Sequence, residues 1–407
     1  MGYTRSVISG FGWHTALKIG TAGVTILKLF VLARLLSPQE FGVFSLIAIA
    51  LGLTEAATET GINITILQSP HSIHYYLNTA WVIALLRGLV IGSAMVLLGA
   101  FMGGYYEEPS LPMLIGLAAL VPVIKGAINP SIVLMQKNLT FFKESIYRFA
   151  LVLVEALLAV ILAMALNSVV GLILAMIGGA IFEVLISFLF FADRPRFVLI
   201  PSRAKEIMRN AKGLTISAAL SYFYQNADDA IVGKALGTYN LGLYHNAYAL
   251  GHKTSYEFAQ SAHHGTLPVL TKIVNDTPRL KRAFIKAFLS SMALVTTLSL
   301  PLAIAPRWFV TLLLGEQWLD IVPVAPVMVL AGILASGALI CYSLFVATKT
   351  YAYMNLHLGA SVGLMILFLA WFSPIWGLTG AAWALVLSRI LPLPILIYGI
   401  KRTLYRE

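Results

Sequence analysis

The sequence predicts an all-α polytopic membrane protein with about 12 transmembrane helices in two parallel-repeat six-helix bundles around a central cavity. The first observation is composition: of 407 residues, 59% are hydrophobic and 11% are charged, whereas about 25% of the residues of a soluble domain are charged. The second is a nearly unbroken series of apolar stretches, each near the roughly 20 residues that cross a bilayer. The third is an internal repeat that relates the two halves.

The apolar stretches predict the spanning helices in chain order. They cover residues 11–35, 41–67, 77–103, 111–136, 144–166, 168–191, 211–235, 240–265, 283–305, 321–346, 351–372 and 377–400. The seventh and eighth are the least apolar, and they span the bilayer only if their polar sides face water or protein. The first is longer than the apolar core of a signal peptide and no A-x-A-like site follows it, so it is expected to remain as a helix.

Basic residues are concentrated on one side of the predicted membrane. The termini and the connectors on their side carry 17 lysines and arginines, whereas the opposite connectors carry three, Arg34, Lys234 and Arg307. The positive-inside rule therefore places both termini in the cytoplasm. This bias also accounts for the net charge of +11, so no nucleic-acid partner is expected. The single cysteine, Cys341, excludes an intramolecular disulfide.

The repeat sets the expected domain organisation. Ala33–Phe44 aligns without gaps on Gly233–Tyr244, with basic, leucine, glycine and aromatic positions in common. The basic connector 192–210 lies between the halves, so lobes are expected at residues 1–200 and 201–407. Six helices per lobe is an even number, so both lobes run in the same direction across the membrane. Parallel repeats around a shared cavity are typical of transporters that work by alternating access.

The first predicted helix carries a polar stripe. His14, Lys18, Thr21, Thr25 and Lys28 follow one another at spacings of three or four residues, which places them on one helical face. Charges at membrane depth are costly, so each is a candidate functional group. The stripe indicates a cavity wall with cations at two depths. The alternative is that both lysines extend to the nearest helix end.

The second predicted helix carries two carboxylates, Glu55 and Glu59, one turn apart, with Asn63 on the same face. Two carboxylates so placed repel each other, which favours the binding of a proton or another cation and suits ion coupling. The alternative role is an ion pair with Lys18 or Lys28 that holds the bundle together.

The two least apolar helices carry further polar residues. Gln225, Asp228 and the adjacent Asp229 lie in the seventh helix. In the eighth, His245, His252 and His263 share one face, and Lys253 and Glu257 lie on another. Histidines here can change their charge during transport. No metal site is expected, because His245 and His252 are seven residues apart and no carboxylate cluster surrounds them.

Five more charges lie near the middles of predicted helices. The cations are Arg87, Lys125 and Arg389, and the carboxylates are Glu155 and Glu183. Pairing within each bundle is the expected role, although the cations can also contact an anionic substrate.

Motifs for other functions are missing from the sequence. No Walker loop, dinucleotide fingerprint or zinc signature is present, so no cofactor is expected and the chain is not expected to be an enzyme. A membrane glycosyltransferase or polymerase requires a large outer loop with paired carboxylates, and the outer connectors are short. A drug or small-cation exporter is a further alternative, favoured if acidic residues dominate the cavity.

Two motifs resemble a known family. Leu32–Phe44, and Asn226–Gly237 followed by Leu241–Tyr244, resemble signatures of the polysaccharide transporter (Wzx-type oligosaccharide flippase) family. This family belongs to the multidrug, oligosaccharidyl-lipid and polysaccharide (MOP) exporter superfamily. The helix pattern extends the resemblance over essentially the whole chain.

The resemblance implies a flippase of the bacterial inner membrane that moves an undecaprenyl-diphosphate-linked oligosaccharide from the cytoplasmic to the periplasmic leaflet. By position, Lys18, Lys28 and Lys253 would bind the diphosphate. The residues expected to bind the substrate are Lys18, Thr21, Thr25, Lys28, Asn63, Gln225, His252 and Lys253. A proton or sodium gradient would drive the cycle through Glu55, Glu59, Asp228, Asp229 and Glu257. Membrane lipids, a polysaccharide polymerase and glycosyltransferases are the other expected partners.

Overall fold

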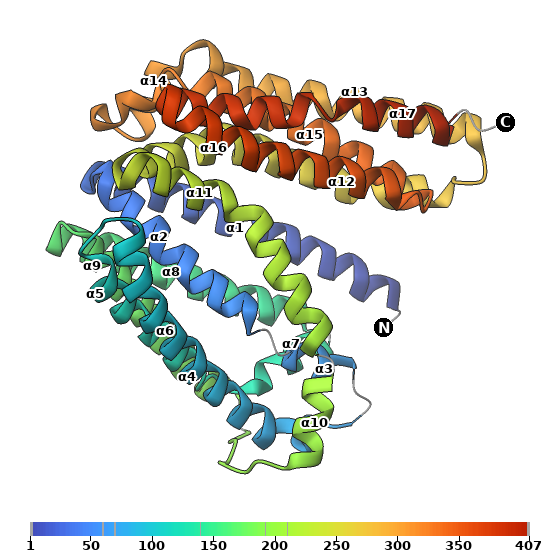
Figure 1. Cartoon of the computed structure of the whole chain (residues 1–407). Helices are drawn as coiled ribbons and strands as arrows, with labels where there is room; N and C mark the ends of the chain where they lie inside the picture. Colours follow the sequence, from blue (N-terminus) through green and yellow to red (C-terminus); the bar gives the residue numbers. More distant parts are fainter. Residues whose placement is uncertain are drawn as a thin grey trace. The chain divides into compact units, whose positions relative to one another are not determined.

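The computed structural model describes residues 3–58, 61–68, 71–138, 140–191, 193–209 and 211–404. Within these ranges, the side chains of residues 3–16, 18–19, 64, 68, 211–214, 216–217, 220–221 and 224 are not described. The described residues form helices and connectors, with no β-strand among them. Figure 1 shows these helices coloured along the chain.

The structure divides into two compact units, Met1–Asn226 and Ala227–Glu407. The division falls inside helix α11 (Ala211–Ala247), later than the predicted lobe boundary after residue 200. The division lies this late partly because the N-terminal part of α11 packs in the first unit, where Tyr222 contacts α2. The Tyr222 hydroxyl donates to the Ala48 carbonyl at 3.0 Å, and its ring lies where a Gly52 side chain would be.

The first unit consists of long apolar helices interrupted by short ones. Its elements are α1 (Tyr3–Leu35), α2 (Pro38–Ala57), α3 (Ile62–Gln68), α4 (Ile73–Tyr105), α5 (Leu111–Ala118), α6 (Leu120–Lys125), η1 (Pro130–Ile132), α7 (Val133–Lys137), α8 (Phe141–Leu166), α9 (Val169–Phe190) and α10 (Pro201–Arg209). Helix α8 packs against both α1 and α9, and α4 packs against α5 and α6.

The motif that opens α2 is a helix-start signal. Ser37 is the N-cap: its hydroxyl accepts from the Glu40 backbone N–H, and the Glu40 carboxylate accepts from the Ser37 N–H at 2.9 Å. Pro38 occupies the first turn, where no backbone donor is needed. A reciprocal capping box of this kind satisfies two otherwise unpaired donors. The turn between α1 and α2 is therefore specified by Ser37-Pro38-Gln39-Glu40.

The fourth predicted span is broken rather than continuous. Leu111–Lys125 and Pro130–Lys137 are bent by 67° relative to each other. Side chains satisfy backbone groups at the break: Trp81 Nε1 donates to the Ala127 carbonyl at 3.0 Å, and the Asn129 N–H donates to Ser187 Oγ at 3.0 Å. Non-helical backbone at membrane depth is tolerated where protein or a cavity surrounds it.

The basic connector after α9 packs on α4. The Tyr76 hydroxyl donates to Glu206 at 2.6 Å, and the Arg203 guanidinium lies 4.1 Å from the centre of the Tyr75 ring. Ile207 of α10 is fully buried in a hydrophobic cluster with residues of α4. The connector is thus part of the first unit, attached to α4 by these contacts.

The second unit is built around α15, the most buried of the membrane-crossing helices. Its elements are the end of α11, the π-helical turn η2 (Tyr248–Lys253), α12 (Thr254–Lys272), α13 (Thr277–Ile304), α14 (Pro306–Leu313), η3 (Glu316–Ile321), α15 (Ala325–Ala347), α16 (Tyr351–Ile390) and α17 (Leu393–Leu404). Helices α12, α13 and α16 pack around α15, as does η2.

Glycines with positive φ mark two predicted boundaries between spans. Gly237 (φ 79°) lies between the predicted helices 211–235 and 240–265, and Gly377 (φ 57°) lies within α16, at the start of predicted helix 377–400. Side chains disfavour this conformation, so glycine permits the chain to reverse there. Just beyond Gly237, the Tyr239 hydroxyl donates to Asp320 at 2.9 Å, and this bond raises the pKa of Tyr239.

Seven helices of the described part are long and apolar enough to cross a membrane, or eight if the bent pair is one span. One of these candidates, Tyr351–Leu404, combines α16 and α17 and contains 54 residues. At about 1.5 Å per residue it exceeds twice the roughly 30 Å thickness of a hydrocarbon core. This length and the break at Gly377 fit the two predicted spans in that region. The chain is thus an all-α polytopic membrane protein, consistent with the predicted twelve spans.

Candidate functional site

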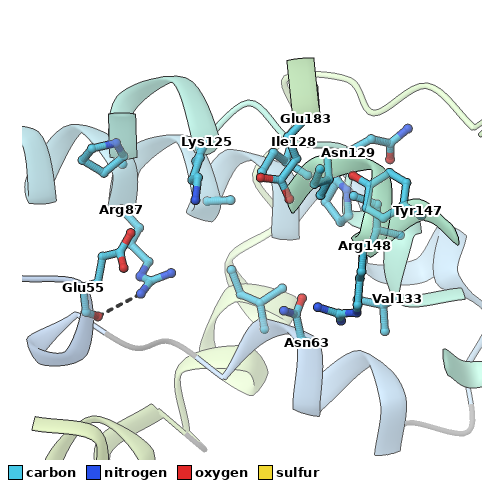
Figure 2. Close-up of a pocket in the computed structure, with 18 of the residues that line it drawn as sticks. Glu55, Asn63, Arg87, Lys125, Ile128, Asn129, Val133, Tyr147, Arg148 and Glu183 are labelled. Atoms are coloured by element: carbon cyan, nitrogen blue, oxygen red, sulfur yellow. Dashed lines mark hydrogen bonds between the residues drawn. The ribbon is translucent and has the colours of Figure 1, made fainter. Parts of the chain in front are cut away.

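Polar residues of the first unit line a pocket at its broken helix. The pocket has a volume of about 350 Å³ and is bordered by α2, α3, α4, α6, η1, α7, α8 and α9. Three cations and three carboxylates line it, namely Arg87, Lys125, Arg148, Glu55, Glu144 and Glu183. Figure 2 shows Lys125 beside the break, with Asn129, Tyr147 and Glu183 further along the pocket.

Arg87 holds the end of α2. Its Nε donates to the Thr58 carbonyl at 2.8 Å, and its second guanidinium nitrogen donates to the Glu55 carbonyl at 2.9 Å. The carbonyls at a helix C-terminus carry partial negative charge and lack helical partners, so a guanidinium stabilises them. Arg87, expected to pair within the bundle, therefore satisfies backbone groups of a neighbouring helix (Figure 2).

A buried carboxylate connects α7 and α8. Glu144 Oε1 accepts from Arg148 Nε at 2.8 Å and from Gln136 Nε2 at 2.7 Å. Glu144 Oε2 and the Tyr147 hydroxyl are buried and have no hydrogen-bond partner among the described residues. Both residues line the pocket, and these two atoms retain unused hydrogen-bonding capacity.

Lys28 of the predicted stripe forms an ion pair. Its ammonium lies 3.2 Å from Glu155 Oε1, between α1 and α8, with the side chains 28% and 44% exposed. The sequence suggests Glu55 or Glu59 as its partner; the structure shows Glu155, and Glu59 lies outside the described residues. The Thr21 hydroxyl donates to the Leu17 carbonyl at 2.8 Å, and Thr25 is exposed. The side chain of Lys18 lies outside the described residues.

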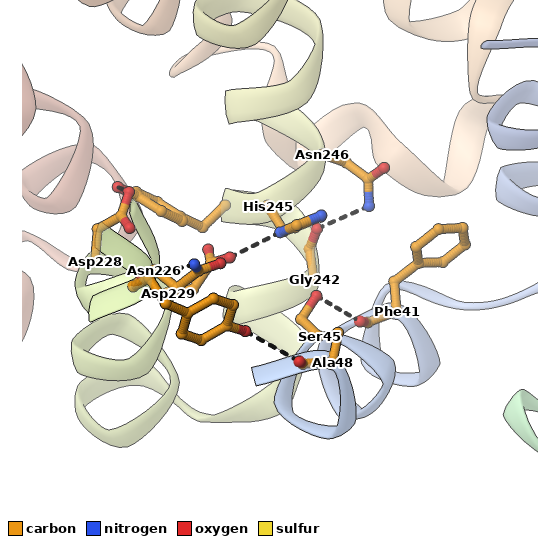
Figure 3. Close-up of polar contacts among 11 residues, drawn as sticks. Phe41, Ser45, Ala48, Asn226, Asp228, Asp229, Gly242, His245 and Asn246 are labelled. Atoms are coloured by element: carbon orange, nitrogen blue, oxygen red, sulfur yellow. Dashed lines mark hydrogen bonds and ion pairs between the residues drawn. The ribbon is translucent and has the colours of Figure 1, made fainter. Parts of the chain in front are cut away.

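Two buried aspartates form the polar cluster of the second unit. Asp228 accepts from the Tyr244 hydroxyl at 3.0 Å, and Asp229 Oδ2 lies 2.9 Å from His245 Nδ1. Asp228 and Asp229 are only 6% and 9% exposed. Figure 3 shows Asp229 directed at His245 and Asp228 on the other side of the same helix turn. Both contacts link the residues before Gly237 to those after it.

His252 lies in the middle of an aromatic stack along η2 and α12. Its ring centre is 4.3 Å from that of Tyr248 and 6.0 Å from that of Tyr256. Its Nε2 contacts the guanidinium of Arg389, and its buried Nδ1 has no partner among the described residues. Because arginine only donates, Nε2 must accept and the hydrogen lies on Nδ1. π-Helical turns often occur at functional sites.

The remaining predicted residues are placed as follows. Gln225, Lys253 and Glu257 are exposed within the described structure, and Asn63 is exposed and lines the pocket of the first unit. Glu59 lies outside the described residues.

Sequence reasoning missed several residues of both clusters. Glu144 and Arg148 are four residues apart on α8, a spacing that favours an ion pair and could have identified them. Tyr244, Tyr248, His252 and Tyr256 recur at the same interval, which predicts a stack on one helical face. No sequence pattern predicts that Glu144 Oε2 lacks a hydrogen-bond partner. Among the described residues, no group of three or more histidine, cysteine or acidic side chains could hold a metal ion.

Structural comparison defines the class of protein. The fold is similar to the inward-facing conformation of a multidrug resistance MATE family transporter of the MOP superfamily, with a TM-score of 0.67. The identity is 12%, and the match covers 95% of this chain and 96% of that one. The molecule is a multi-pass membrane protein whose fold is similar to that of this transporter.

Sequence comparison gives the family. The profile described as "Polysaccharide biosynthesis protein" matches residues 31–323, and the chain belongs to this family. The lipopolysaccharide biosynthesis protein WzxC of Escherichia coli (strain K12) is 25% identical over 83% of this chain and 69% of its own length. The succinoglycan biosynthesis transport protein ExoT of Rhizobium meliloti (strain 1021) is 24% identical over 80% of this chain and 66% of its own length. These relatives are transport and biosynthesis proteins of polysaccharides, which confirms the family expected from the two motifs.

Proposed function

We propose that this protein moves an undecaprenyl-diphosphate-linked oligosaccharide from the cytoplasmic to the periplasmic leaflet of a bacterial inner membrane. The observation that carries the proposal is the family match over residues 31–323. Both termini lie in the cytoplasm, as the charge bias favours. Glycosyltransferases supply the loaded lipid, and a polymerase consumes it after transfer.

The physical task is to take a large polar head across about 30 Å of hydrocarbon while the lipid tail stays in the membrane. Ammonium groups replace the water around the diphosphate through charge-assisted hydrogen bonds. Lys18, Lys28 and Lys253 serve this purpose. The exposed side chain of Lys253 is available to an anion, and Lys28 exchanges its contact with Glu155 for one with the diphosphate.

The lining hydroxyls and amides bind the sugars. Thr21, Thr25, Asn63 and Gln225 offer donors and acceptors, and His252 offers the N–H of its Nδ1. The substrate must be bound with similar affinity at the two sides, since a state that bound it much more tightly would retain it. Alternating access of the two lobes then delivers the head to the other leaflet.

A proton or sodium gradient drives the cycle through carboxylates. Asp228 and Asp229 are the main candidates, because two adjacent buried carboxylates repel each other unless a cation or proton joins them. The hydrogen bond from Tyr244 and the contact with His245 hold the two side chains in place. Glu55, Glu59 and Glu257 are the further coupling residues.

Deleting the gene tests the proposal. We expect loss of the surface polysaccharide and accumulation of the lipid-linked oligosaccharide on the cytoplasmic side, both restored by the wild-type gene. Asp228→Asn with Asp229→Asn should restore little polymer at a normal protein level, whereas Glu316→Gln, an exposed outer carboxylate, should restore it fully. A deletion strain with normal polymer but increased sensitivity to cationic dyes would instead identify a drug exporter.

A further inference from the structure

The pocket of the first unit offers binding capacity that its own residues leave unused. Glu144 and Tyr147, on consecutive turns of α8, are 3% and 4% exposed, and each ends in a polar atom without a partner among the described residues. Leaving such a buried group unsatisfied costs about 1–3 kcal/mol. Both residues line the same pocket of about 350 Å³, a volume at the small end of small-molecule sites.

The charges around the pocket select the chemistry of the occupant. Lys125 and Arg148 oppose a bound metal cation, and the described residues provide no cluster of three metal ligands. Glu144 and Glu183 equally oppose a bound anion. With three groups of each sign on the wall, a neutral ligand meets the smallest electrostatic penalty.

The donors and acceptors of the wall specify a polyhydroxylated ligand. Glu144 Oε2 can only accept when ionised, Lys125 can only donate, and the Tyr147 hydroxyl and the Asn63 amide can do both. A sugar hydroxyl is at once donor and acceptor, so neighbouring hydroxyls of one ring can satisfy groups of both kinds. Figure 2 shows Lys125, Asn63 and Tyr147 around the pocket, on different elements.

We propose that this pocket is a saccharide subsite that binds one neutral sugar residue of the transported glycan. Glu144 Oε2 and the Tyr147 hydroxyl bond its hydroxyls, Lys125 donates to a ring or hydroxyl oxygen, and the broken helix at Gly126–Asn129 makes room for it. The subsite rests on the proposed flippase function, and it places glycan recognition inside the first unit.

A photocrosslinking experiment tests the subsite in the full chain. A photoreactive phenylalanine analogue replaces Leu151, which lines the pocket, or Leu153, which lies two residues further along α8 and is absent from the lining. Cells are fed a radiolabelled sugar and irradiated. We expect a labelled adduct at position 151 and none at 153. After hydrolysis of the glycosidic bonds, mass spectrometry of the adduct peptide should show one neutral sugar still bonded to residue 151.

Tyr147→Phe provides the functional measurement. It removes only the unpartnered hydroxyl, so a purely structural residue would lose neither stability nor transport. We expect unchanged or higher thermal stability and flipping slowed about two- to tenfold, the value of one hydrogen bond. Tyr351→Phe, at an exposed phenol outside the pocket, should transport at the wild-type rate.

The outcomes separate the subsite from the flippase. Absence of an adduct at position 151 in a variant that restores surface polymer, or wild-type flipping by Tyr147→Phe, would overturn the subsite and leave the flippase proposal intact. An acidic sugar in the adduct would overturn the assignment to a neutral residue. A deletion strain that keeps its polymer and accumulates no lipid-linked glycan would overturn the flippase proposal itself.

Discussion

Lys28 has one contact in the structure and a second that we propose. The sequence placed it on a polar stripe, and the structure gives it Glu155 as a partner at 3.2 Å. Both side chains remain partly exposed, so an anion can compete for the ammonium. Moving the ammonium of Lys28 from a carboxylate to a diphosphate costs little free energy, because an anion neutralises its charge in both states.

A double-mutant cycle measures this pair. Lys28→Met and Glu155→Leu are each expected to lower the free energy of unfolding, with a coupling of about 0.6–1.7 kcal/mol, the range for polar contacts between membrane helices. Thermal unfolding of the purified variants in one detergent, followed by tryptophan fluorescence, provides the measurement. Additive effects would show that the pair does not stabilise the protein. If Lys28 also binds the diphosphate, Glu155→Leu keeps transport and Lys28→Met loses it.

Single residues with polar contacts were predictable where polarity stands out against an apolar background. Lys28, Asp228 and His252 were found in this way, because a charged or polar group at membrane depth requires a partner or water. Their partners were not predictable. Glu155 and Arg389 lie on other helices whose rotation the sequence does not specify, and Tyr244 lies across the break at Gly237 from Asp228. The unpaired Glu144 Oε2 is a property of the packed structure alone.

At the scale of elements, the helices follow from hydropathy and their breaks from local chemistry. The capping box at Ser37 and the glycines Gly237 and Gly377 lie at boundaries that the apolar pattern predicted. The break at Gly126–Asn129 was not predicted, because the residues on both sides are apolar and the stretch is long enough for one span. Its stability depends on Trp81 and Ser187, which are distant in sequence.

Close packing of η2 on α15 positions the aromatic stack of the second unit, and it leads to a specific prediction. A methyl group at Gly332 would lie 2.8 Å from His252 Cα and 2.9 Å from its carbonyl oxygen. Because these backbone atoms of His252 cannot move away without shifting η2, Gly332→Ala should destabilise the protein by about 1–3 kcal/mol. Gly359→Ala, where nothing lies within 4 Å, should be neutral or stabilise α16 by up to about 1 kcal/mol.

Labelling of the single cysteine measures directly how these two variants change the stability of the second unit. Cys341 is buried in α15, so a thiol-reactive dye labels it only as the second unit unfolds. Heating the purified protein with the dye should show an earlier transition for Gly332→Ala than for Gly359→Ala. Equal transition temperatures would mean that η2 moves away from α15 at little cost.

At the scale of the molecule, the fold class and family were predictable, because composition, spacing and two motifs are independent of packing detail. The position of the boundary between the two units was less predictable. The basic connector 192–210 was expected to lie between the lobes, yet contacts such as Tyr76 with Glu206 attach it to α4 of the first unit. Those contacts join residues far apart in sequence, which no local pattern reveals.

Orientation in the membrane is the property of the whole molecule that the charge distribution alone predicts. In a Cys341→Ala background, single cysteines can replace Ser110, an exposed residue of an outer connector, or Ser202, an exposed residue of the basic connector. A membrane-impermeant maleimide should label Ser110→Cys in intact spheroplasts and Ser202→Cys only after lysis, because basic connectors are retained in the cytoplasm. The reverse pattern would place the termini outside, and the cations near the basic connector would then face the product side of the flipping reaction.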